Sequence, residues 1–336
     1  MDLNNVDYSF NSILELIELT NKYKKTKKRP RKGIILEKNE KYKYNPDIEN
    51  LCESVEALKK LNKLIGMESL KKDIIDQVLF FSQDLNTNEM MHTCLTGPPG
   101  VGKTTLGKIL AELYCSLGFL KTNKFKVVSR PDLIAGYLGQ TALKTQKVLT
   151  ESLGGVLFID EAYSLGNNDD DSGNAYSKEC IDTINKFLSE NTTNFVLIIA
   201  GYKDELDKCF FSQNKGLERR FPWRYDLIEY SSNNLKDIFK FQVSSNGWYI
   251  DLSVDDDKLT NFFELFNKKG LFSNNGGDTL ILFDKAKIIH ARRVFGKSFY
   301  MKKHLTLEDL TNAANLMEQL KSKLKKVNSP PFGMYT

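Results

Sequence analysis

The segment from Gly97 to Thr105, Gly-Pro-Pro-Gly-Val-Gly-Lys-Thr-Thr, constrains the fold more than any other part of the sequence. It matches the pattern G-x-x-x-x-G-K-[ST]. A chain that wraps a phosphate must turn tightly and point backbone N–H groups inward, which glycine permits and a Cβ obstructs. The pattern therefore predicts a phosphate-binding loop, formed by Gly97, Pro98, Pro99, Gly100, Val101, Gly102, Lys103, Thr104 and Thr105.

The residue types in this loop predict its ligands. Lys103 can reach the β- and γ-phosphates of a nucleotide, and the Thr104 hydroxyl can bind Mg²⁺. The flanking sequence fits, because an apolar strand at 91–96 precedes the loop and an apolar helical stripe from Leu106 to Leu113 follows it. The alternative, a glycine-proline turn with a chance lysine, does not explain why strand, loop and helix occur in this order.

A second motif ends a buried strand. The run Gly155–Asp160, Gly-Val-Leu-Phe-Ile-Asp, is apolar up to its last residue and is followed by Glu161. Asp160 can hold the Mg²⁺ hydration shell, and Glu161 can orient and polarise an attacking water. The two motifs together therefore predict a nucleoside triphosphatase that uses Mg²⁺.

Strands alternate with helices up to about residue 230, and helices at 232–245, 255–268, 279–295 and 306–324 follow. Alternation of this kind is typical of an α/β fold in which helices sandwich a parallel sheet. We expect a nucleotide-binding α/β domain at 55–230, a smaller α-helical lid domain at 231–326 and a disordered tail at 327–336.

Residues 1–54 form a predicted N-terminal extension, with a short amphipathic helix at 9–20 and then a basic run at 22–32. Like charges and Pro30 favour an exposed linker over residues 22–32. The alternative is a nuclear-targeting or nucleic-acid-binding patch, which lacks flanking aromatic residues other than Tyr23.

Composition excludes several classes of protein. The five cysteines form no C-x-x-C pair, and the three histidines stand apart, so we expect neither a disulfide framework nor a zinc site. No apolar run reaches the length of a membrane span, and the N-terminus lacks a signal-peptide pattern. We expect an intracellular protein, cytoplasmic or nuclear, without a membrane partner.

Together, these motifs resemble the AAA+ ATPases, and within them the CbxX/CfxQ family that includes red-type rubisco activases. The resemblance spans roughly residues 60 to 300. Besides the phosphate-binding loop, it rests on the segments Leu64–Met67, Gly136–Thr141, Phe158–Tyr163, Ile199–Asp204 and Gly216–Phe221.

The resemblance implies self-association into a ring, usually a hexamer, with nucleotide between neighbouring subunits. It assigns Arg220 as the arginine that one subunit supplies to the next, with Arg219 as a second candidate and an ordinary surface ion pair as the alternative. Tyr137 and Leu138 match the pore loop that grips a protein client, although Tyr137 could instead cap the sheet. Tyr202 takes the place of the sensor residue after the fourth strand.

Two further regions are open at this stage. Ile65 and Gly66 lie in an apolar bend that either walls the adenine or belongs to the core. The arginines with which relatives contact nucleotide from the lid are missing from the turn at 275–280. An ATP-driven motor acting on an unknown protein client is the favoured function. The alternatives are a nucleic-acid-associated ATPase, which would bind through 22–32, and a nucleotide-switched scaffold with weak turnover.

Overall fold

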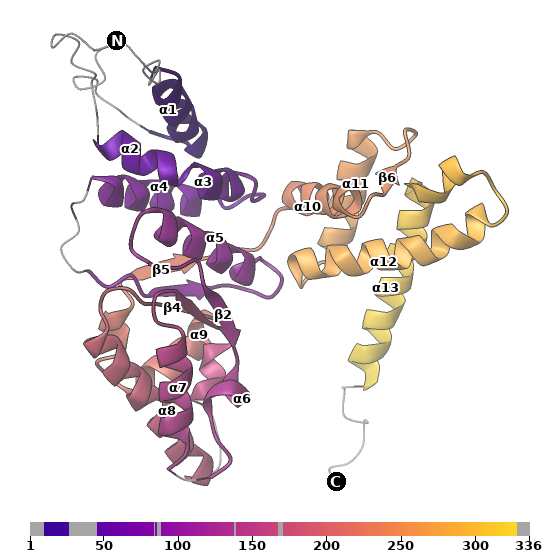
Figure 1. The fold of residues 1–336 in the computed structure, drawn as a ribbon. Coiled ribbons are helices and arrows are strands. Elements are labelled where there is room, and N and C mark those ends of the chain that lie inside the picture. The colour runs from indigo at the N-terminus through magenta and orange to yellow at the C-terminus, as the bar shows by residue number, and fades with distance from the viewer. Residues whose placement is uncertain are drawn as a thin grey trace, which may run out of the picture. The chain divides into compact units, whose positions relative to one another are not determined.

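The structure is a computed structural model. It describes residues 10–26, 46–83, 85, 89–137, 139–166 and 171–327. The chain forms two compact units (Figure 1). The first holds the described residues up to Gly97 together with Lys103–Leu227, and the second holds Pro98–Gly102 together with the described residues from Ile228 onward.

The first unit is built on a parallel sheet of five strands in the order β2-β3-β4-β1-β5. The three central strands are entirely buried, as expected for a parallel sheet covered on both faces. This confirms the predicted P-loop α/β fold. The strands are β1 (Thr93–Thr96), β2 (Phe125–Val128), β3 (Val156–Ile159), β4 (Val196–Gly201) and β5 (Trp223–Asp226).

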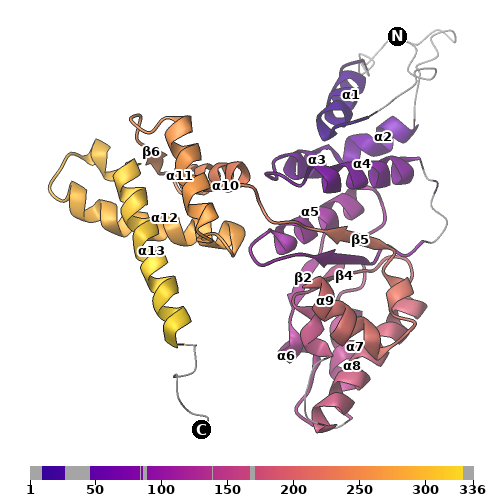
Figure 2. The same cartoon turned by 180° about the vertical axis from the view of Figure 1, so that it is seen from behind.

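Helices cover both faces of this sheet. Figures 1 and 2 show α2–α5 on one side and α6–α8 on the other. The first group comprises α2 (Pro46–Glu53), α3 (Val55–Asn62), α4 (Glu68–Ser82) and α5 (Lys103–Ser116). The second comprises α6 (Arg130–Leu133), α7 (Thr141–Glu151) and α8 (Asp171–Glu190), and the short helix α9 (Lys203–Glu205) follows β4.

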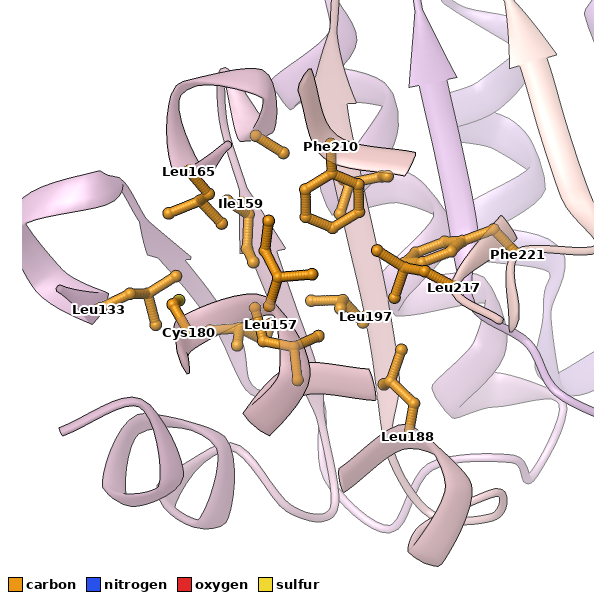
Figure 3. Packing of buried hydrophobic residues seen from close by; sticks show 14 of the residues in the cluster. Leu133, Leu157, Ile159, Leu165, Cys180, Leu188, Leu197, Phe210, Leu217 and Phe221 are labelled. Carbon is orange, nitrogen blue, oxygen red and sulfur yellow. The ribbon is translucent and has the colours of Figure 1, made fainter. Parts of the chain in front are cut away.

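The core beneath α7 and α8 shows why the strands are apolar. Alternate residues of a strand point to the same face, so Leu157 and Ile159 of β3 and Leu197 of β4 meet the helices together. Figure 3 shows these side chains packed with Cys180 and Leu188 of α8. The same packing holds β3 and β4 in place where they lead into the candidate site.

The N-terminal helix differs from its prediction. Helix α1 is Ile13–Thr26, so the basic run at 22–32 begins inside a helix, and residues 27–32 lie outside the described part of the chain. Leu16 and Tyr23 are buried, and α1 packs on α2, α3 and α4. Burial of Tyr23 explains why the helix continues into the lysines, whose charged ends remain exposed.

The second unit is helical, with α10 (Ser232–Ser245), α11 (Asp256–Lys268), α12 (Asn275–Val294) and α13 (Leu307–Val327). Two short strands, β6 (Tyr249–Ile250) and β7 (His304–Leu305), pair in parallel. Side-chain caps begin α10 at Ser231 and α11 at Asp255. The predicted tail from residue 328 onward lies outside the described residues. None of the described helices combines the length and apolarity needed to cross a bilayer.

Candidate active site

The phosphate-binding loop joins β1 to α5 and requires glycine at two positions. Gly97 has φ +146°, and a Cβ there would lie 2.4 Å from the backbone oxygen of Leu227. Gly100 has φ +73°, and its Cβ would lie 2.0 Å from the backbone oxygen of Asn274. Another residue would therefore be strained in conformation and would clash with neighbouring backbone.

Lys103 and Thr104 open helix α5 and face the second motif. The Lys103 ammonium donates to the Gly97 backbone oxygen at 2.8 Å. Burial lowers the pKa of Lys103, and the carboxylates of Asp160 and Glu161 oppose that shift. The Thr104 hydroxyl donates to Asp160 Oδ2 at 3.4 Å. The two sequence motifs therefore meet in one place.

Sheet topology explains this meeting. Lys103 follows strand β1, Asp160 follows β3 and Tyr202 follows β4. Strand β4 lies between β1 and β3 in the sheet. The carboxyl ends of parallel strands share one edge of the sheet, which is where α/β folds place their ligands. The Lys103 ammonium lies 5.4 Å from the centre of the Tyr202 ring. The sensor candidate Tyr202 therefore stands beside the lysine.

Glu161 occupies an unusual conformation at this edge. Its backbone is left-handed, with φ 50° and ψ 47°, and its N–H donates to Asp160 Oδ1 at 3.1 Å. The side chain is exposed. Burial and the nearby Glu161 carboxylate raise the pKa of Tyr163 to about 12. A strained residue that is held in place and open to solvent is suited to contact a ligand.

The donor atoms fit a hard cation. No group of three or more His, Cys, Asp or Glu residues in the described chain could hold a metal ion. Mg²⁺ does not need such a cage, because it keeps several waters and binds one or two protein oxygens together with substrate phosphates. The Thr104 hydroxyl and the Asp160 carboxylate offer that kind of oxygen pair.

Arg220 lies at the other edge of the sheet. The helical turn Glu218–Arg220 precedes β5, whose first residue Trp223 pairs with Thr93 at the start of β1. Because all five strands are parallel, this is the edge where strands begin, whereas Lys103 follows the end of a strand. Arg220 is therefore not brought to the Lys103 site of its own chain. Its Nε is buried and has no hydrogen-bond partner in the described chain.

Arg219 differs from its neighbour. It is exposed and, with Lys215, Glu218 and Arg224, lines an open pocket of about 490 Å³. Arg224 is already engaged, since it pairs with Glu218 at 3.3 Å. The surface ion pair that was the alternative reading of this turn therefore belongs to Arg224 in the described structure.

Three other predicted residues, Tyr137, Ile65 and Gly66, lie in bends of the first unit. The Tyr137 side chain is 74% exposed, so it does not cap the sheet, and Leu138 lies outside the described residues. Ile65 is half-buried in the bend between α3 and α4, where Gly66 has φ +71°. A role for Ile65 and Gly66 against the adenine stays a prediction.

One contact at this edge was missed from the sequence. Asp226, at the end of β5, accepts a hydrogen bond from the Thr96 hydroxyl directly before the loop and from Lys203 at 2.8 Å. These two hydrogen bonds lower the pKa of Asp226. The sequence signal that could have indicated this contact is Asp226 itself, an aspartate directly after the alternating apolar and polar residues Trp223–Tyr225.

Comparisons with known proteins point to one family. Residues 93–221 match the model of the "ATPase family associated with various cellular activities (AAA)". The chain is 40% identical to the CfxQ-like protein R730 of Acanthamoeba polyphaga mimivirus over 79% of this chain and 65% of that protein. It is 33% identical to the CfxQ homologue of Pyropia yezoensis over 76% of this chain and 85% of that one.

Solved structures agree on the fold. The AAA domain of FIGL-1 in complex with ADP superposes with a TM-score of 0.57, covering 81% of this chain and 90% of that domain. Its sequence is only 20% identical, so this likeness concerns the fold alone.

Proposed function

The chain belongs to the AAA ATPases of the CbxX/CfxQ family, and on this basis we propose that it binds ATP with Mg²⁺ and hydrolyses it. The single observation that carries the proposal is the hydrogen bond of 3.4 Å between Thr104 and Asp160. It joins a phosphate-binding loop to a carboxylate pair at the edge of the sheet where α/β folds bind ligands.

Each residue has a distinct part in the proposed reaction. Lys103 places positive charge against the β- and γ-phosphates, and the amides of the loop bind their oxygens. Glu161 orients the attacking water and accepts its proton. Thr104 and Asp160 would hold Mg²⁺, which when bound would supply positive charge that offsets the negative charge of the phosphates.

Arg220 completes the site from a neighbouring subunit in this proposal. Its place at the opposite edge of the sheet leaves it unable to serve the Lys103 of its own chain. In a ring, that edge can face the nucleotide of the next copy. An arginine supplied in trans stabilises charge on the transferring phosphoryl group. Ring formation and a hexameric state are part of the proposal.

The experiment that tests the reaction is Glu161→Gln. This variant should bind a fluorescent ATP analogue as tightly as the wild type, because the loop is intact. Phosphate release should fall by about 100-fold or more, since the water loses its base. Glu151→Gln, on the exposed face of α7, is a matched control that should retain turnover. Undiminished phosphate release from Glu161→Gln would overturn the assignment.

We also propose that the substrate of this motor is a polypeptide gripped by Tyr137. The exposed ring stands beside Gly136 and Gly139, where an added Cβ would meet no atom within 4 Å. An aromatic side chain with this freedom can contact varied side chains without reading a sequence.

Crosslinking and mass spectrometry of Glu161→Gln in cell extract should capture a client, and adding Tyr137→Ala should release it. Equal capture by both would contradict this role.

The alternatives receive less support. A nucleic-acid partner depends on residues 22–32, of which 27–32 lie outside the described chain, while Lys24 donates to the Cys52 backbone oxygen. Salt-dependent DNA or RNA binding would be needed to favour it. The hypothesis of a scaffold with weak turnover rests on the arginines that are missing from the lid. A negligible rate of phosphate release by the purified wild-type protein would favour it.

A further inference from the structure

Three successive carbonyls of the phosphate-binding loop accept hydrogen bonds inside the second unit. This unit contains Pro98–Gly102 as well as the lid helices. One donor is a side-chain amide, one is a backbone N–H and one is a phenol. The bonds are Asn275 Nδ2 to Pro99 O at 3.2 Å, Gly276 N to Gly100 O at 3.1 Å, and Tyr230 OH to Val101 O at 2.8 Å.

The donors are themselves fixed in place. Asn275 is 2% exposed, and its Oδ1 accepts the Tyr230 N–H at 3.0 Å, so one amide side chain links two of the three donors. Its φ is +47°, a left-handed conformation that asparagine tolerates better than most residues. The buried Asp278 carboxylate accepts from Asn274 N at 2.9 Å and from Lys321 at 2.9 Å. The start of α12 is therefore a rigid support.

The three bonds also orient the loop's own N–H groups. In a planar trans peptide the C=O and the following N–H point in opposite directions, and the described chain contains no cis peptide. Fixing the carbonyls of residues 99–101 therefore turns the N–H groups of Gly100, Val101 and Gly102 away from Asn275 and Tyr230. No described residue accepts a hydrogen bond from these three N–H groups. They are free to bind an anion.

We propose that Asn275 and Tyr230 are positioning residues that hold the phosphate-binding loop in its anion-binding conformation and couple the lid to the bound nucleotide. This inference rests on the proposed function, in which the loop binds nucleotide phosphates. It supplies a lid contact that does not require the arginines missing from 275–280. Such coupling is reciprocal. If the contact between the lid and the loop raises the affinity for nucleotide, bound nucleotide stabilises that contact by the same free energy.

Two substitutions test the contact. Tyr230→Phe removes one donor with little change of shape, and Asn275→Gly removes the amide while still permitting a positive φ. Tyr225→Phe is the matched control, because its hydroxyl makes a comparable buried bond of 2.7 Å to Gln77 in the first unit. Tyr230→Phe should bind a fluorescent ADP analogue roughly three- to tenfold more weakly, as expected for one lost hydrogen bond. Asn275→Gly should lose at least as much affinity, because its amide makes two hydrogen bonds. The control should stay within about twofold.

A second measurement separates positioning from general stability. In the wild type, ADP should slow amide hydrogen exchange at 230–235 and 275–280, and Tyr230→Phe should lose most of that protection even at saturating ADP. Full binding and full protection in both test variants would overturn the inference. If Asn275→Gly does not fold, Tyr230→Phe alone decides. Failure of the wild type to bind ADP would instead refute the proposed function.

Discussion

Thr104 and Asp160 are separated by 56 positions in the sequence, yet the hydroxyl of one donates to the carboxylate of the other at 3.4 Å. They meet because β1 and β3 run parallel with β4 between them and end at the same edge of the sheet. Both groups are oxygens of the kind that binds Mg²⁺ together with its waters and substrate phosphates.

Thr104→Ala should raise the Mg²⁺ concentration needed for half-maximal ATPase activity by about tenfold, because in the proposed site Mg²⁺ would lose one of its protein oxygens. A magnesium titration of phosphate release measures the shift. Thr150→Ala is the control, since Thr150 lies exposed on α7 and donates only to the Gln146 backbone oxygen at 2.8 Å. An unchanged magnesium requirement in Thr104→Ala would remove this residue from the metal site.

Arg220→Ala should abolish ATP turnover but keep nucleotide binding, because Arg220 lies away from the loop of its own chain. Mixing it with Glu161→Gln gives a sharper result. An Arg220→Ala subunit still has Glu161, and a Glu161→Gln neighbour still offers Arg220, so some mixed interfaces are complete. Two inactive proteins should therefore regain part of the wild-type rate of phosphate release.

The control for this mixture is each variant incubated with itself. Arg219→Ala should retain most of the activity, since its side chain lines the exposed pocket beside Glu218. Absence of any recovery in the mixture, with mixed assembly shown by native mass spectrometry, would argue against an arginine supplied in trans.

Gly107→Ala should destabilise the first unit. An added Cβ would lie 2.7 Å from Cε2 and 2.8 Å from Cδ2 of the fully buried Phe158 ring. Overpacking of this kind costs about 1–3 kcal/mol, and the higher helix propensity of alanine offsets up to about 1 kcal/mol. Urea unfolding measures the difference. Gly136→Ala, with nothing within 4 Å of its Cβ, should be nearly neutral. A gain in stability for Gly107→Ala would show that α5 can move away from β3.

Acid should weaken the second unit through Asp309. Burial raises the pKa of this carboxyl, but its hydrogen bonds with Arg293, the Thr306 N–H and His290 outweigh burial and bring the pKa to about 2. Because this folded-state value lies below the ordinary 3.8, the stabilisation is complete above about pH 4 and is lost as the pH falls toward 2. The difference corresponds to about 2 kcal/mol.

Tryptophan fluorescence can follow this loss. The two tryptophans fall one in each unit, and Trp248 packs edge-on against His290 at 5.4 Å. In Trp223→Phe, only Trp248 reports on unfolding. The urea concentration at the unfolding midpoint should decrease as the pH is lowered from 4 to 2. Adding Asp309→Asn should make this midpoint nearly independent of pH over the same range. A profile that Asp309→Asn leaves unchanged would exclude Asp309 as the cause.

The parts of this fold that the sequence predicted are those marked by a pattern within a short stretch of chain. The apolar runs before Gly97 and Asp160 are buried strands, and the parallel sheet follows from their alternation with helices. The sequence analysis did not predict strand β5. Within this strand Arg224 and Asp226 are exposed, and only Tyr225 is fully buried. A strand at the edge of a sheet lacks the continuous apolar run that marks a central one.

The lid contact could not be found from local patterns. Helix α12 was expected to begin at residue 279, since Asn-Gly-Gly usually interrupts a helix, but it begins at Asn275. Its first residues are set by bonds to a loop about 175 positions earlier, and no periodicity in the sequence reports such a bond. The charges of Lys24 and Lys25 likewise masked a helix whose other face is buried.

Helix α1 has a practical consequence for any study of the basic run at 22–32. Its apolar face covers α3 and α4, so a chain shortened to start at Pro46 would uncover leucines and isoleucines that are now hidden from water. Such a surface invites aggregation, and loss of nucleic-acid binding by the shortened chain would reveal nothing about charge. Exchanging the lysines and arginines of 27–32 for glutamine in the full-length chain would alter the charge and leave this cover intact.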